Sequence, residues 1–156
     1  MKKTYIIIAI IVGLLIIGIV LYLIFFKKEQ NVETNETLKV VDKVKIIIGE
    51  KELIVNLENN STANKLVEKL EEGNITIEAT EYGGFEKVGD LGFKLPRADK
   101  YTQTKVGDVL LYNGNQIVIF YGTNTWNYTR IGKIDISQEE LKDILGDGDI
   151  TYIITK

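Results

Sequence analysis

An apolar stretch of about 22 residues, from Tyr5 to Phe26, constrains this chain more than any other feature, because it contains no charged residue and no proline. At ~1.5 Å per helical residue it can cross a hydrocarbon layer of ~30 Å. We therefore predict an uncleaved transmembrane signal-anchor over residues 1–28 that contacts the membrane through residues 5–26. A cleavable signal peptide is the main alternative, but its apolar region is usually about 7 to 15 residues long. A buried core helix is rarely this long and apolar on all faces.

Two lysines lie on each side of this stretch, so the positive charge that sets membrane orientation is nearly balanced. Lys2 and Lys3, directly before the apolar run, are typical of a signal-anchor whose N-terminus stays inside the cell. We expect a single-pass protein of a prokaryotic cell membrane with an extracytoplasmic globular domain.

Residues 29–40 are polar and have few apolar side chains, which predicts a tether without a core of its own. Residues 41–156 are then one domain of ordinary size. All 22 acidic residues follow Lys28, whereas four of the 19 basic residues do not, so this part of the chain is acidic. Such a surface argues against nucleic acid as a partner.

Cysteine and histidine are both absent from the sequence. Thiol nucleophiles, disulfides, Cys/His zinc sites and histidine acid–base chemistry are therefore excluded. The segment Asp147-Gly148-Asp149 lacks the twelve-residue ligand pattern of an EF-hand loop, so we interpret it as a turn. We predict no catalytic residue, no metal site and no cofactor.

The domain begins with a predicted hairpin, because two runs of β-branched residues, Val44–Ile48 and Leu53–Leu57, flank a short turn that contains glycine. Apolar residues at helical spacing follow, and Gly73 ends that helix. Its N-cap is one of Asn60, Ser61 and Thr62.

A third strand is predicted where Ile75 and Ile77 alternate with polar residues. From about Glu81 to Val106 the periodicity disappears, which predicts a long loop region. Loops of this kind often carry functional residues.

The segment Asn113-Gly114-Asn115 gives the strongest turn signal, because Asn-Gly supplies the positive φ angles of a tight hairpin. Its arms are Val109–Tyr112 and Gln116–Tyr121. The second arm is apolar without alternation, so we predict a central strand covered on both faces.

The final part combines a strand over Tyr128–Ile136, a helix capped by Ser137 that ends near Leu145, and a last strand over Ile150–Thr155. Together these elements amount to seven or eight strands and two short helices. Short strands at regular spacing favour a closed or nearly closed barrel. The predicted fold class is therefore mainly β: a closed eight-stranded barrel with two short α-helices, preceded by one transmembrane α-helix.

Two groups of aromatic and charged residues are candidates for a binding site. The first lies in the predicted loop region and comprises Tyr82, Phe85, Glu86 and Lys87 around paired glycines. The alternative for this group is a structural turn whose Phe85 packs on the barrel.

The second group comprises Trp126, Tyr128 and Arg130, which face the same side if they lie on one strand at a spacing of two. An arginine over aromatic rings can bind a carboxylate or polarise an amide, or it can brace the barrel rim by a cation–π contact. We predict that the two groups line one ligand-binding groove.

Several short stretches occur in a characteristic order between about Val41 and Thr155. They are Glu86-Lys87 after the glycine turn, Leu95-Pro96, Gly107-Asp108-Val109 leading into Leu111-Tyr112, Ile119-Phe120-Tyr121, and Tyr128 to Ile134. With the opening hairpin and the final Gly-Asp-Gly-Asp strand, this order resembles the cyclophilin-like fold family of bacteria and archaea. The resemblance implies an eight-stranded barrel closed by two helices. It implies no isomerase activity, because the Phe-His-Arg and Gln-Gly-Gly-Asp stretches of authentic cyclophilins do not occur in the sequence.

These inferences favour a membrane-anchored, non-catalytic binding module for an extended peptide, a protein or a small ligand. The main alternative is a membrane-anchored peptidyl-prolyl cis-trans isomerase in which Arg130 polarises the prolyl amide. A further alternative is a purely structural scaffold domain that needs no groove.

Overall fold

The computed structural model describes residues 15–23 and 41–156, and the chain divides between Val40 and Val41 into two units that are treated separately. Residues 15–23 of the first unit are helical, and their large apolar side chains are exposed. The rest of the predicted signal-anchor and tether, residues 1–14 and 24–40, lies outside the described residues. No helix within the described residues combines the length and the apolar character needed to cross a membrane. The transmembrane helix therefore stays a prediction.

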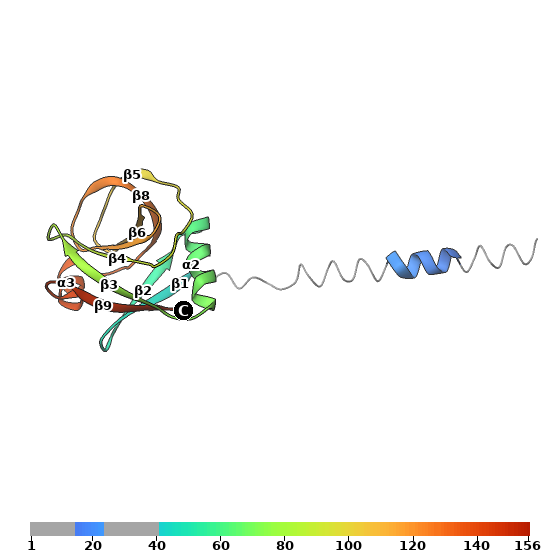
Figure 1. Ribbon diagram of the computed structural model, residues 1–156, viewed down its shortest axis with the longest axis horizontal. Helices are drawn as coiled ribbons and strands as arrows, with labels where there is room; N and C mark the ends of the chain where they lie inside the picture. The colour runs from blue at the N-terminus through green and yellow to red at the C-terminus, as the bar shows by residue number, and fades with distance from the viewer. Residues whose placement is uncertain (1–14, 24–40) are drawn as a thin grey trace, which may run out of the picture. The chain divides into compact units, whose positions relative to one another are not determined.

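The second unit contains one antiparallel sheet of nine strands, so the predicted mainly β fold is confirmed (Figure 1). The strands are β1 (Lys43–Ile48), β2 (Lys51–Leu57), β3 (Ile75–Tyr82), β4 (Glu86–Asp90), β5 (Lys100–Gln103), β6 (Asp108–Tyr112), β7 (Gln116–Phe120), β8 (Thr125–Lys133) and β9 (Ile150–Thr155). Their spatial order is β2-β1-β9-β3-β4-β7-β6-β8-β5. Because β2 also pairs with β8, eight strands close into a ring, and β5 attaches to β8 alone.

Both hairpins predicted from turn residues are present. The first joins β1 to β2, which pair from Lys43↔Asn56 to Ile48↔Lys51. The second joins β6 to β7 through Asn113 and Gly114, whose φ angles of 52° and 84° are positive as a tight Asn-Gly turn requires. β7 lies between β4 and β6, so its predicted central position is confirmed.

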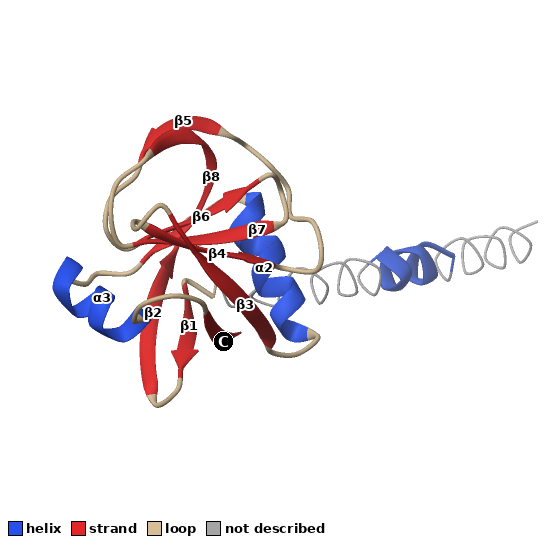
Figure 2. Cartoon of the chain, turned by 60° about the vertical axis from the view of Figure 1, so that its left-hand side comes forward, coloured by secondary structure: helices blue, strands red, loops and turns tan. Residues whose placement is uncertain are grey.

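The two helices of the domain lie apart from each other beside the ring of strands (Figures 1 and 2). α2 (Ser61–Glu71) begins after Asn60, and α3 (Gln138–Leu145) begins after Ser137. In each case the side chain of the capping residue accepts a hydrogen bond from a backbone N–H of the first turn, which would otherwise lack a partner. Asn60 is thus the cap among the three candidates, and the predicted Ser137 cap is confirmed.

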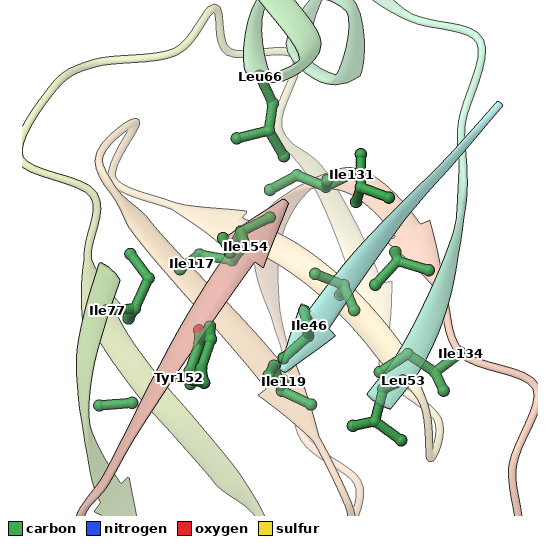
Figure 3. Packing of buried hydrophobic residues seen from close by; sticks show 14 of the residues in the cluster. Ile46, Leu53, Leu66, Ile77, Ile117, Ile119, Ile131, Ile134, Tyr152 and Ile154 are labelled. Atoms are coloured by element: carbon green, nitrogen blue, oxygen red, sulfur yellow. The ribbon is translucent and has the colours of Figure 1, made fainter. Parts of the chain in front are cut away.

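The main hydrophobic core is built from side chains of both helices and of strands all around the ring (Figure 3). Ile46 of β1, Ile77 of β3 and Ile119 of β7 are fully buried there, and α2 and α3 add Leu66 and Leu141. Complete burial of one such side chain contributes roughly 1.5–3 kcal/mol. Both helices are therefore fixed to the ring through one shared core.

A smaller cluster, called the outer cluster here, covers the opposite face of β6, β7 and β8 and consists of Leu110, Val118, Phe120 and Tyr128. Side chains alternate between the two faces of a strand. Ile117 and Ile119 therefore enter the main core, whereas Val118 and Phe120 join the outer cluster. This double burial explains the continuous apolar run of β7 and confirms that the strand is covered on both faces.

The predicted loop region from about Glu81 to Val106 is wrong in part. β3 continues to Tyr82, and the region contains the two further strands β4 and β5. Three charged residues and a glycine among the five residues of β4 conceal its alternation, and β5 is a short polar strand at the end of the sheet. Glu86 and Lys87 consequently lie on a strand rather than in a loop. β8 also starts earlier than predicted, at Thr125, and ends at Lys133.

Candidate functional site

A hollow of about 500 Å³, called the outer-face pocket below, lies over the side of the sheet that carries the outer cluster. Its lining comprises Thr80, Tyr82, Glu86, Val88, Tyr112, Gln116, Val118, Asn124, Trp126 and Tyr128. Four of these side chains are aromatic. Tyr82 and Trp126 are 63% and 54% exposed, so the pocket presents large apolar surface to solvent. Exposed aromatic side chains beside a concave surface are typical of binding sites.

Tyr128 is the most firmly held of these aromatic residues. Its ring centroid lies 5.4 Å from that of Phe120 in an edge-on arrangement and 5.9 Å from that of Tyr112. Its hydroxyl accepts a hydrogen bond of 3.0 Å from Nδ2 of Asn124. Burial raises the pKa of Tyr128 to about 12, and the carboxylate of Glu86 adds to the rise. The phenol therefore stays neutral and supplies a fixed wall.

Glu86 lines the outer-face pocket from β4, and only 5% of the residue is exposed. Within the described part of the chain, its Oε2 is buried and has no hydrogen-bond partner. Burial raises the pKa of Glu86 from 4.5 to about 7, because the ionised carboxylate loses its hydration. A carboxyl oxygen without a partner can accept a hydrogen bond from a donor group of a ligand.

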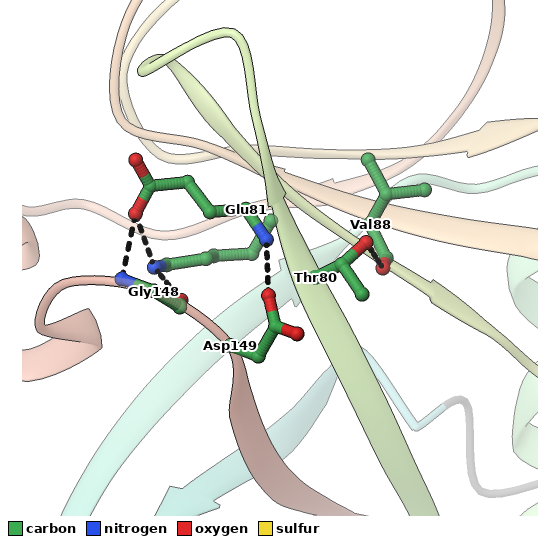
Figure 4. Close-up of polar contacts among 6 residues, drawn as sticks. Thr80, Glu81, Val88, Gly148 and Asp149 are labelled. Atoms are coloured by element: carbon green, nitrogen blue, oxygen red, sulfur yellow. Dashed lines mark hydrogen bonds and ion pairs between the residues drawn. The ribbon is translucent and has the colours of Figure 1, made fainter.

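Lys87 faces the other way, and its side chain is fully buried. Its ammonium group donates a 2.9 Å hydrogen bond to Oε2 of Glu81 and another to the carbonyl of Gly148. The same Glu81 oxygen accepts the N–H of Gly148 at 2.9 Å (Figure 4). The Lys87 hydrogen bond, followed by that of Gly148, lowers the pKa of Glu81. Lys87 therefore links β4 to β3 and to the turn before β9.

Arg130 lies at a second hollow, of about 280 Å³, which Tyr128 also lines. Its guanidinium nitrogens are 3.3 and 3.4 Å from the carboxylate oxygens of Asp108. Asp108 is buried and also accepts a 3.0 Å hydrogen bond from the backbone N–H of Lys105. The arginine thus pairs with a buried acid of β6 and does not line the outer-face pocket.

The structure brings four of the seven predicted site residues into the outer-face pocket, namely Tyr82, Glu86, Trp126 and Tyr128. Phe85, Lys87 and Arg130 are not among the lining residues. Phe85 packs against the outer cluster, and its ring centroid lies 6.1 Å from that of Tyr82 in an edge-on arrangement.

Sequence reasoning missed the other six lining residues, which are Thr80, Val88, Tyr112, Gln116, Val118 and Asn124. The position of Tyr112 could have been predicted, because it lies two residues after Leu110 on an arm of the Asn-Gly hairpin. Side chains at that spacing lie on the same face of a strand. Asn124 lies between β7 and β8, where no pattern was available. Within the described ranges, no three acidic side chains lie close enough together to hold a metal ion.

The family model described as the Cyclophilin-like family matches residues 46–155, which is most of the chain. This chain belongs to the cyclophilin-like family. The family resemblance drawn from the order of motifs is thereby confirmed. The cyclophilin-like domain is also similar to the solution structure of a hypothetical protein from Archaeoglobus fulgidus, with a TM-score of 0.57 and 18% sequence identity. The alignment covers 77% of this chain and 98% of that chain, and at this identity it shows a shared fold alone. No curated protein matches the sequence.

Proposed function

We propose that the cyclophilin-like domain is a non-catalytic binding module and that the outer-face pocket is its ligand site. The proposal depends on one observation: exposed Tyr82 and Trp126 stand beside a hollow of about 500 Å³ whose other walls are held in place by the sheet. Ligand pockets usually measure about 300–1,000 Å³ and combine apolar walls with a few polar groups. The pocket accommodates a small molecule or one side chain of an extended peptide.

Trp126 allows a direct test, because it is the single tryptophan of the sequence and lines the pocket. Full-length protein in a non-ionic detergent is titrated with a panel of small metabolites and extended peptides while tryptophan emission is recorded. We expect at least one ligand class to change the emission in a saturable way.

Variants locate that signal on the molecule. Tyr82→Ala is expected to weaken binding about tenfold or more, since a buried aromatic contact contributes a few kcal/mol. Tyr101→Ala removes another exposed aromatic, on β5 and outside the pocket lining, and is expected to leave the affinity unchanged. If no member of the panel changes the emission, the binding proposal fails and a scaffold role becomes the better explanation.

The isomerase alternative requires Arg130 to be available to a prolyl amide. Its guanidinium is instead close to the Asp108 carboxylate, and the residue lines the smaller hollow. We therefore expect no turnover in a protease-coupled assay with proline-containing peptides. Turnover that Arg130→Ala abolishes would replace the binding module by an enzyme.

The membrane anchor is a separate part of the proposal. It is supported by the uncharged stretch of residues 5–26 and by the lysines on both sides of it. We propose a single-pass cell-membrane protein with its N-terminus inside and its domain outside. The protein should then stay with membranes after alkaline carbonate washing, and protease added to intact cells should remove the domain. Release by carbonate would contradict anchoring, and full protection from protease would contradict the orientation.

A further inference from the structure

Glu86 is the single acidic or basic residue, tyrosines aside, in the lining of the outer-face pocket. The other polar groups there are hydroxyls and amides of Thr80, Gln116 and Asn124, together with the tyrosine hydroxyls. An ionised Glu86 therefore places a negative charge in the pocket without a compensating positive charge. Buried charges in proteins are ordinarily paired, because the loss of hydration is otherwise too costly.

Lys87, next to Glu86 in sequence, and Arg130, two residues after the pocket residue Tyr128, are engaged elsewhere. Lys87, the next residue, points to the opposite face of β4 and bonds Glu81 and Gly148. Arg130 on β8 is paired with Asp108. Within the described residues no donor reaches Oε2 of Glu86.

We infer that the outer-face pocket binds an organic ammonium ion that carries at least one N–H, and that the ammonium group pairs with the carboxylate of Glu86. The inference rests on the proposed binding function and names its ligand class. A hydrogen bond between two charged partners supplies both the missing donor and the missing positive charge.

The aromatic walls suit the same ligand. Tyr82, Tyr112 and Trp126 line the pocket, and aromatic rings attract a cation and also contact its alkyl groups. Tyr128 is held by Phe120 and by Asn124, so one wall is formed before a ligand arrives. Preformed walls reduce the ordering cost of binding.

Ligands that lack either the positive charge or the N–H fit less well. An anion would be repelled by the ionised Glu86. A quaternary ammonium would satisfy the charge but not Oε2, because it has no N–H to donate. A neutral alcohol of the same length could donate a hydrogen bond but would leave the charge without a counter-ion. These differences define the probes.

The test measures affinity with the full-length protein in a non-ionic detergent at pH 8, by Trp126 emission and by calorimetry. The probes are n-butylammonium, tetramethylammonium, 1-butanol and butyrate. We expect saturable binding of n-butylammonium, at least about tenfold weaker binding of tetramethylammonium and 1-butanol, and no binding of butyrate.

Two charge-matched variants assign the effect to Glu86. Glu86→Gln should weaken n-butylammonium binding about tenfold or more, because the charge-assisted hydrogen bond is lost. Glu78→Gln removes the same charge from an exposed position of β3 outside the pocket lining and should change affinity less than about twofold. Circular dichroism checks that both variants are folded. If Glu86→Gln does not fold, Tyr82→Ala takes its place and must weaken n-butylammonium binding more than Tyr101→Ala does.

A further titration with two peptides identifies the source of the ammonium group. Acetyl-Gly-Lys-Gly-amide is compared with the same peptide carrying norleucine in place of lysine. Tighter binding of the lysine peptide than of n-butylammonium assigns a lysine side chain, and the reverse order assigns a free amine. Either order satisfies the inference.

The outcomes separate the inference from the function on which it rests. If 1-butanol binds as tightly as n-butylammonium, or if Glu86→Gln binds as tightly as the parent protein, the ammonium inference is wrong while the binding module stands. The same holds if only other members of the ligand panel change Trp126 emission. If neither these probes nor that panel changes it, both fail.

Discussion

Glu86 and Lys87 are adjacent and oppositely charged, yet they do not form a pair. The alternation of side chains along β4 places Glu86 at the outer-face pocket and Lys87 at the turn before β9. The sequence identified both residues as candidates and could not separate their roles, because it showed no strand at this point. The separation depends on the pairing of β4 with β3 and β7.

Glu86 predicts an unusual pH dependence of stability. Its pKa is about 7 in the folded protein and 4.5 in the unfolded chain, so its stabilising contribution is complete below about pH 4.5 and is lost as pH rises through 7. The loss is at most about 3.5 kcal/mol, at about 1.4 kcal/mol per pKa unit. Urea unfolding should show the parent protein less stable at pH 8 than at pH 5, whereas Glu86→Gln should lose most of that difference.

The control for this prediction is Glu78→Gln, which should keep the pH dependence of the parent. Glu81 and Asp99 have lowered pKa values, so their contributions are lost only as pH falls below the range tested. Equal stability of the parent at pH 5 and pH 8 would contradict the assignment of a raised pKa to Glu86.

Lys87 should be important for stability and not for binding. Lys87→Ala removes a buried alkyl chain and leaves the Gly148 carbonyl without its donor, so we expect a loss of roughly 2–4 kcal/mol. Lys87→Met keeps the apolar volume and should lose less. A double-mutant cycle with Glu81→Gln should give a favourable coupling energy in urea unfolding. Zero coupling would show that the ion pair contributes nothing.

At the scale of elements, local signals predicted hairpins and helix starts well. The Asn-Gly turn fixed β6 and β7, and Ser137 fixed the start of α3, because each depends on backbone geometry within a few residues. β4 and β5 were missed because β4 shows no apolar alternation and β5 is short, polar and mostly exposed, so both depend on pairing with strands elsewhere in the sequence. Six of the ten residues that line the outer-face pocket were not predicted, because strands far apart in the sequence bring them together.

Asn60 shows how one capping residue can serve two elements. Its Oδ1 accepts the N–H of Ala63 at 2.9 Å, and its Nδ2 donates to the carbonyl of Arg130 at 2.9 Å, which ties α2 to β8. Asn60→Ala should destabilise the domain by about 2 kcal/mol. Asn60→Asp keeps the cap but not the donor and should recover about half of this loss.

The matched control for the cap is the exposed neighbour Asn59. Asn59→Ala should change the free energy of unfolding by less than about 0.5 kcal/mol. If Asn60→Asp is as unstable as Asn60→Ala, the bond to β8 and not the cap supports the helix.

At the scale of the whole domain, ring closure depends on a short contact between β2 and β8. Only Asn56↔Lys133 and Leu57↔Gly132 are paired there. A Cβ on Gly132 would lie 2.4 Å from the backbone oxygen of Asn56, so the strands can approach only because this residue has no side chain. No local pattern in the sequence indicates such a requirement.

Gly132→Ala is therefore expected to open the ring and to destabilise the domain by roughly 3 kcal/mol or more. Hydrogen exchange should report the opening at the N–H of Glu58, which bonds the carbonyl of Ile131. A Cβ on Gly49 would meet no atom within 4 Å, so Gly49→Ala introduces only the strain of its positive φ. This change is expected to destabilise the domain by about 1–2 kcal/mol. Equal effects of the two changes would show that the β2–β8 contact is not tight.

The position of β9 between β1 and β3 has a consequence for biosynthesis. Residues 150–155 pair with residues 45–47 on one side and with residues 75–79 on the other. The first strands made by the ribosome must therefore wait, with one edge each unpaired, until the segment near the end of the domain has emerged. Contacts between such distant residues slow folding, and unpaired strand edges promote aggregation. The nascent domain is thus most vulnerable during its own synthesis, when chaperones that shield open strand edges would matter most.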